Sequence, residues 1–160
     1  MEWIFKLPHE LSIITVGMLP VFELRGAIPL GFYLNMPLEK IFILSIIGNL
    51  IPVIPLYFLL KPISNLLSRL NLFKAFFDWL FTHTKQRAEI VQRYEALGLM
   101  LFVAIPLPIT GAWTGTIAAS LFRIKFKYAI LAVTLGVIIA GVIVTTLCLL
   151  GKLSWQIIIK

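Results

Sequence analysis

An acidic and a basic residue lie in the middle of a long apolar run, and they restrict the folds that are open to this chain. The run covers residues 11–36, and Glu23 and Arg25 are its charged residues. A charge at the centre of a bilayer is costly unless it is paired, hydrated or neutralised, so an ionisable residue at that depth is a candidate for function. The motif Glu-Leu-Arg-Gly-Ala-Ile-Pro at residues 23–29 is therefore the first candidate site.

The composition predicts a membrane protein. Of the 160 residues, 60% are hydrophobic and 13% are charged, and the mean hydropathy is +1.00. These values lie far from those of soluble domains, so we expect one integral membrane domain over residues 1–160, in the plasma membrane. The net charge of +7 comes from basic residues beside apolar segments, which fits topology and anionic lipid better than nucleic acid. The single Cys148 excludes an internal disulfide.

Enzyme chemistry is not expected from this sequence. It contains no phosphate-binding loop, no dinucleotide fingerprint and no nucleophile paired with a base. His9 and His83 have no other ligand types close by in the sequence, so neither a metal site nor another cofactor is expected.

The first apolar run fits a straight transmembrane helix poorly. Besides the two charges it contains Gly17, Pro20, Gly26, Pro29 and Gly31. Pro29 lacks an amide donor and its ring clashes with the carbonyl of Arg25, and in lipid such freed groups must be satisfied by protein or water. A re-entrant helical hairpin over residues 8–35, with its tip at residues 23–27, meets these constraints because each arm is too short to span the bilayer.

A full transmembrane span is predicted at residues 38–60. Pro37 and Glu39 favour a helix start, because proline is tolerated in a first turn and an acidic residue is favoured there by the helix dipole. Asn49 and Pro52 predict a polar point and a kink near the middle of the membrane.

The second half is predicted to repeat this order after a cytoplasmic connector. The connector covers residues 61–96 and includes an amphipathic helix at residues 62–81. A second broken run at residues 97–122 predicts a hairpin, and residues 126–150 predict a span. The breaks in this run are Pro106, Pro108, Gly111 and Gly115.

Two topologies stay open for this order of elements. If each half crosses once, the halves form an inverted pseudo-two-fold repeat, as in broken-helix transporters; a shift of 85 then pairs Gly26 with Gly111, and a shift of 88 pairs Gly48 with Gly136. The alternative is four ordinary spans. Both arrangements place nine basic residues in the cytoplasm against four outside. They differ at the termini, which lie outside for hairpins and inside for four spans.

The candidate substrate- or proton-binding residues come from the two broken runs and from the polar point of the first span. Glu23 can exchange a proton, and the forked guanidinium of Arg25 suits a phosphate or a carboxylate. Structural alternatives stay open: an ion pair that pins the hairpin, close helix packing at a Gly-x-x-x-Gly pattern, and an interhelical bond from the asparagine. The candidates are Glu23, Arg25, Gly26, Pro29, Asn49, Pro108, Thr110, Gly111, Trp113 and Thr114.

The two motifs resemble a known family. Residues 23–29 together with Pro-Leu-Pro-Ile-Thr-Gly-Ala-Trp-Thr-Gly at residues 106–115 are similar to the small multidrug export proteins of bacteria and archaea. That family looks like a compact relative of the DedA and VTT-domain superfamily, which implies facing re-entrant hairpins and proton-dependent movement of lipid carriers such as undecaprenyl phosphate. By this resemblance Glu23 matches the acidic residue of the first re-entrant loop, and Arg25 a substrate or structural partner. The arginines of the second DedA hairpin have no counterpart in residues 106–115.

We therefore expect a proton-linked membrane transporter or flippase for an amphiphilic, anionic or lipid-phosphate substrate, with membrane lipids as its surroundings and a homodimer as its assembly. Two alternatives are a small multidrug exporter of cations, which requires a net acidic cavity, and a non-transporting scaffold or assembly factor that uses residues 62–81.

Overall fold

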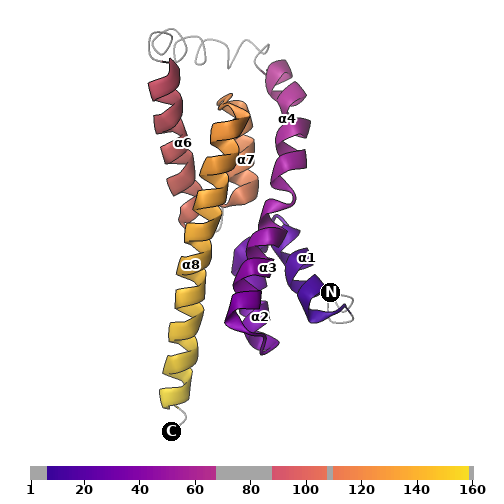
Figure 1. Cartoon of the computed structure of the whole chain (residues 1–160), viewed down its shortest axis with the longest axis vertical. Helices are drawn as coiled ribbons and strands as arrows, with labels where there is room; N and C mark the ends of the chain where they lie inside the picture. Colours follow the sequence, from indigo (N-terminus) through magenta and orange to yellow (C-terminus); the bar gives the residue numbers. More distant parts are fainter. Residues whose placement is uncertain (1–6, 68–87, 108–109, 159–160) are drawn as a thin grey trace.

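The computed structural model describes residues 7–67, 88–107 and 110–158, and this part of the chain is built from helices (Figure 1). The helices are α1 (His9–Met18), α2 (Glu23–Tyr33), α3 (Leu38–Leu50), α4 (Val53–Leu67), α6 (Ala88–Ala104), α7 (Ala112–Leu121) and α8 (Phe126–Ile158). No strand occurs in the described residues, which confirms the predicted all-α class.

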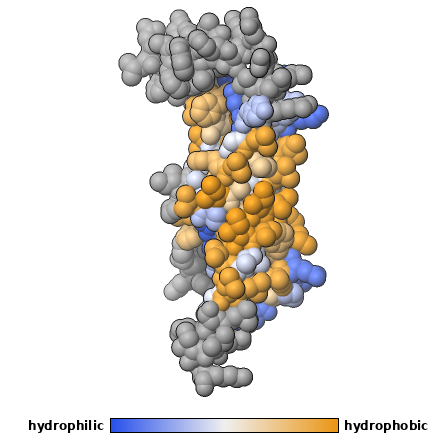
Figure 2. Space-filling view, turned by 90° about the vertical axis from the view of Figure 1, so that its left-hand side faces the viewer, coloured by the Kyte–Doolittle hydropathy of each residue, from blue (hydrophilic) through white to orange (hydrophobic). Residues whose placement is uncertain are grey.

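Two apolar helical stretches are long enough to cross a membrane. They are Leu38–Leu60, which joins α3 to the first part of α4, and Phe126–Lys152 within α8. At about 1.5 Å per residue each exceeds the bilayer core of about 30 Å. Figure 2 shows an apolar surface over the middle of the molecule, with hydrophilic residues gathered toward the two ends.

The remaining helices form two short antiparallel pairs at opposite ends of the molecule (Figure 1). α1 and α2 pack on each other and on α3, whereas α6 and α7 pack on each other and on α8. α1 and α7 have 10 residues each, which at about 1.5 Å per residue is about half of the bilayer core. The connection within each pair lies near the middle of the long axis, so that the two connections face each other.

The turn between α1 and α2 differs from the sequence prediction. It falls at residues 19–22, so residues 23–27 form the first turns of α2 and are not the hairpin tip. The physical reason is Pro20, which disfavours helical backbone in the residue before it; Leu19 is extended, with φ −75° and ψ 133°. Pro29 does not interrupt the helix: it lies inside α2 and is exposed.

The first long stretch breaks where its prolines predict a kink. α3 ends at Leu50 and α4 begins at Val53. The helices also run past the predicted edges of the connector, since α4 continues beyond residue 60 to Leu67 and α6 passes residue 97 without a break. A helix satisfies its own backbone hydrogen bonds in lipid and in water alike, so a change of polarity does not end it. Most of the predicted amphipathic helix, residues 68–81, lies outside the described residues.

The ends of α2 and α7 have the same backbone geometry at positions 88 apart (123 − 35 = 88). Asn35 and Arg123 have φ values of 53° and 54°. In each case the helix ends in a Schellman motif, in which the two amides after the helix bond back to carbonyls of its last turn. At the end of α2, the N–H of Met36 bonds to the Gly31 carbonyl and the N–H of Asn35 bonds to the Phe32 carbonyl. At the end of α7, the N–H of Ile124 bonds to the Ala119 carbonyl and the N–H of Arg123 bonds to the Ser120 carbonyl.

Two glycines at this same spacing allow helices to cross at backbone contact. A Cβ on Gly48 would lie 2.5 Å from the carbonyl oxygen of Ile14, and a Cβ on Gly136 would lie 2.8 Å from that of Met100. Small residues permit such close approach, which supplies the dispersion energy that holds helices together in lipid. The first crossing joins α1 to α3, and the second joins α6 to α8.

We expect Gly48→Ala to lower the stability of the purified protein by about 1–3 kcal/mol, because the added methyl group meets the backbone of Ile14. The measurement is the thermal unfolding midpoint in detergent. Gly98→Ala is the matched control in a helix interior, since no atom lies within 4 Å of the Cβ that it adds. Equal midpoints for the two variants would contradict the close crossing.

Candidate functional site

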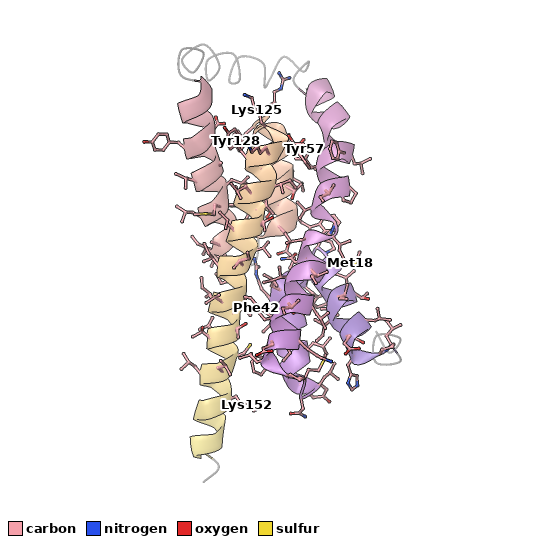
Figure 3. All side chains as sticks on the ribbon, viewed as in Figure 1. Met18, Phe42, Tyr57, Lys125, Tyr128 and Lys152 are labelled. Carbon is pink, nitrogen blue, oxygen red and sulfur yellow. The ribbon has the colours of Figure 1, made fainter. Side chains whose placement is uncertain are left out.

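The side chains of Glu23, Arg25 and Trp113 join one helix pair to the other, close to the connection of each pair. Arg25 donates from Nη2 to the carbonyl oxygen of Thr110, and also to the Thr110 hydroxyl at 3.4 Å. In the other direction, the main-chain N–H of Trp113 donates to Glu23 Oε1 at 3.2 Å, and its indole N–H donates to the carbonyl of Met18 at 3.1 Å. Met18 lies near the middle of the long axis in Figure 3. The ends of α1 and α2 that flank the first connection are therefore in direct contact with Thr110 of the second connection and with the start of α7.

Glu23 caps the N-terminus of α7 from another helix. The first amides of a helix have no partner within it, and the helix dipole favours an anion at this end. The main-chain N–H of Trp113 donates to the Glu23 carboxylate at 3.2 Å, and Ala112 lines the same small cavity as Glu23. The residue at the cap position itself, Gly111, has no side chain with which to do so. Glu23 is buried, at 7% exposed, so it replaces water as the acceptor for this helix end.

Gly111 makes room for this carboxylate. A Cβ built on Gly111 would fall on the carboxylate of Glu23, and the φ of +153° at Gly111 is itself unfavourable for other residues. Glu23 also has a positive φ, of 46°. A non-glycine residue in such a conformation costs about 1–3 kcal/mol, and strain of this kind gathers at functional sites. The local backbone on both sides is thus shaped around one contact.

Arg25 is bound to the opposite connection and not to Glu23. Within the described residues, no ion pair joins these two charges. The hydroxyl of Thr110 also stabilises its own connection, because it accepts a hydrogen bond from the N–H of Leu107 at 3.0 Å and donates one to the carbonyl of Ile105. The predicted alternative, an ion pair within one hairpin, is therefore wrong for this geometry. Each charged side chain instead bonds to the other half of the chain.

A small cavity of about 10 Å³ lies behind this contact. Its polar lining consists of Glu23, Arg25 and Asn49, and Asn49 is only 1% exposed. Side chains of α8, among them Val137 and Ala140, form an apolar wall. Sites for drug-sized ligands have volumes of about 300–1,000 Å³, so the cavity in this conformation is closed to such a substrate.

The structure separates the other predicted site residues from this cavity. Gly26 packs against Phe22, Pro29 is exposed on α2, and the Thr114 hydroxyl bonds to the Gly111 carbonyl at 3.4 Å. Pro108 lies outside the described residues. The residues brought together are Glu23, Arg25, Asn49, Thr110, Gly111 and Trp113.

The sequence prediction missed the main-chain groups of the site. The carbonyl of Met18 takes part through a backbone atom, so its side chain gives no signal. Gly111, which the sequence identifies as a break in the second apolar run, is the residue type that could have indicated an anion-binding helix N-terminus.

Metal ligands are not grouped in the described part of the chain: no three His, Cys, Asp or Glu side chains there could hold an ion. The fold and the site define an all-helical membrane protein with a buried, oppositely charged contact between two short helix pairs.

The chain belongs to the family described as "Putative small multi-drug export protein", which matches residues 23–143. The match begins at Glu23, so it includes Glu23, Arg25 and the second connection, whereas the first connection, residues 19–22, precedes it. Searches of curated proteins and of solved structures found no match. The relation to the DedA and VTT superfamily stays a prediction.

We expect Glu23→Ala and Gly111→Ala to be strongly non-additive in unfolding free energy. Each single variant disrupts the cap of α7, whereas in the double variant the methyl group at Gly111 meets no carboxylate. Residues in direct contact show interaction energies of about 0.5–3 kcal/mol in such cycles. The measurement is reversible unfolding in mixed detergent. Additivity within error would show that the absence of a side chain at Gly111 is not required for the Glu23 carboxylate to bind there.

Proposed function

We propose that this protein is a proton-linked transporter that moves an amphiphilic anion, such as a lipid phosphate, across or between the leaflets of the membrane. The observation that carries the proposal is the buried contact at which Glu23 and Arg25 each bond to the opposite half of the chain. Buried charges in a membrane protein mark ion and substrate pathways, because apolar residues would pack there at lower cost. The family description supports an export role.

In this proposal the α1–α2 and α6–α7 pairs are re-entrant hairpins that meet near the bilayer midplane. Their 10-residue helices are too short to span, and Lys125 and Lys152 lie at opposite ends of the molecule (Figure 3). The shared geometry at positions 88 apart and the opposite directions of α3 and α8 support an inverted repeat. Broken helices of such repeats place substrate and coupling-ion sites at the midplane.

Protonation of Glu23 is the proposed trigger for opening. The ionised carboxylate accepts the Trp113 amide hydrogen bond at the positive end of α7, and such a charge-assisted bond is about twice as strong as a neutral one. A proton on Glu23 removes this advantage and loosens the contact between the two connections. The small cavity can then widen toward one side of the membrane.

Arg25 is the proposed anion site once the contact loosens. In the closed conformation its guanidinium is occupied by the carbonyl of Thr110, which an anionic headgroup can replace with a stronger, charge-assisted bond. The Trp113 ring, whose N–H bonds to the Met18 carbonyl, offers an apolar surface for the rest of an amphiphile.

We expect Glu23→Gln and Arg25→Ala to reduce transport at least about tenfold, as expected for the loss of one charged hydrogen bond. The assay follows a fluorescent short-chain lipid phosphate in proteoliposomes, with and without a proton gradient. Glu23→Gln keeps an oxygen that can accept the Trp113 amide but cannot ionise, so it isolates the proton step. Lys40→Ala is the matched control, because Lys40 forms an exposed ion pair with Glu10 at 3.0 Å. Wild-type rates in both site variants, with intact folding, would reject the site.

A second candidate, export of lipophilic cations, is favoured by a groove of about 540 Å³ between α6 and α7. Its lining is mostly apolar, including Phe102 and Phe122, and Glu95 supplies a carboxylate. In the same proteoliposomes, uptake of a lipophilic cation that is lost in Glu95→Gln and kept in Arg25→Ala would support this candidate. The orientation of Arg25 toward the second connection favours the anion.

The hairpin topology predicts that Lys40 and Lys152 lie on one side of the membrane and Lys125 on the other. Four ordinary spans would instead place Lys40 with Lys125 and opposite to Lys152. Single cysteines at these three exposed positions, in a Cys148→Ala background, can be labelled with an impermeant maleimide in intact and opened cells. Labelling of Lys40→Cys and Lys125→Cys from the same side would contradict the hairpins.

A further inference from the structure

Asn49 brings a buried acceptor without a partner to the site. It lies on α3 and is 1% exposed, and its Oδ1 has no hydrogen-bond partner. Buried side-chain oxygens are bonded in the large majority of structures, so an orphan acceptor calls for an explanation. Asn49 lines the same small cavity as Glu23 and Arg25.

The partners of Glu23 suit its ionised form. Its carboxylate accepts the main-chain N–H of Trp113 at 3.2 Å, and an ionised carboxylate is an acceptor only. A protonated Glu23 carries an O–H donor, which an amide N–H cannot accept. The neighbouring guanidinium of Arg25 is also a donor only. The proton therefore requires an acceptor that the closed conformation does not use.

We propose that Asn49 is the positioning residue that accepts the hydrogen bond of protonated Glu23, directly or through one water molecule. Its Oδ1 is an unpartnered acceptor on the cavity wall, and the cavity volume of about 10 Å³ is close to the minimum for one water. The proton comes from water and forms an O–H bond on the carboxylate, and no other covalent bond changes. This inference rests on the proposed function, because it assumes that Glu23 takes up a proton.

The neighbouring charges give this protonation a consequence for the substrate. Arg25, on the same helix, is the charged side chain that lines the cavity beside Glu23. The start of α7 faces the Glu23 carboxylate with a main-chain amide group. The wall that α8 contributes is apolar and includes Val137 and Ala140. Ionised Glu23 and Arg25 sum to zero charge, whereas protonated Glu23 leaves a net positive site. A proton held by Asn49 thus prepares the site for an anion.

The test measures the protonation of Glu23 itself. In pH-titrated infrared difference spectra of the purified protein, the carboxylic acid C=O band of Glu23 is the one missing from Glu23→Gln. We expect Asn49→Leu, which is similar in size but cannot accept, to move the midpoint of this band to lower pH by about one unit, a tenfold change in proton affinity. The band should also move to higher frequency because its hydrogen bond is lost.

Ser45→Ala is the matched control. Ser45 is also buried with an unpartnered hydroxyl, one turn earlier on α3, but it does not line this cavity. We expect its midpoint and band position to equal those of the wild type. If Asn49→Leu does not fold, Asn49→Ala and Asn49→Ser form a second pair, in which Ser keeps an acceptor and is expected to titrate at the higher pH.

Four results separate the two proposals. An unchanged midpoint and band in Asn49→Leu, or an equal shift in Ser45→Ala, would overturn the role of Asn49 while leaving a titrating Glu23. Equal midpoints in the Ala and Ser pair would do the same. If Glu23→Gln removes no titrating band, Glu23 takes up no proton, and the proton step of the proposed function fails together with this inference.

Discussion

The contact between the Glu23 carboxylate and the N-terminus of α7 is the interaction on which the centre of this molecule depends. It satisfies two groups that are costly to bury, since a helix end leaves its first amides without partners and a carboxylate in an apolar bundle leaves a charge without water. The carboxylate supplies an acceptor to the helix end, and the helix end supplies a donor to the carboxylate. The glycine at position 111 and the positive φ of Glu23 are the backbone conditions for this arrangement.

The rest of the bundle holds the two connections at the depth where this contact can form. α1 and α6 lie against α3 and α8 at crossings where glycine brings backbones together, at Gly48 and Gly136. In lipid, helices gain little from the hydrophobic effect, and close packing and interhelical hydrogen bonds take its place. The crossings therefore fix the height of each short pair. Arg25 and the Trp113 indole then bond to main-chain carbonyls across the gap.

A part of this arrangement could be predicted from composition and spacing. The helical class and the two long apolar stretches follow from hydropathy, and the two charges in an apolar run identified Glu23 and Arg25 as site residues. The position of the first turn was predicted too late in the chain. The effect of Pro20 on Leu19 outweighed the polarity of residues 23–27, because charged side chains are accepted inside a helix when another helix end binds them.

The sequence by itself determined that this chain is a helical membrane protein with one acidic and one basic residue inside an apolar run, because hydropathy and the rarity of charges in such runs are local properties of the chain. Only the tertiary structure decided what those charges bind. Glu23 and Arg25 are near neighbours in sequence, yet each bonds to atoms more than eighty residues away, and several of these atoms belong to the backbone. Backbone amides and carbonyls are the same at every position, so the side-chain pattern did not show which of them would be left for a charge to satisfy.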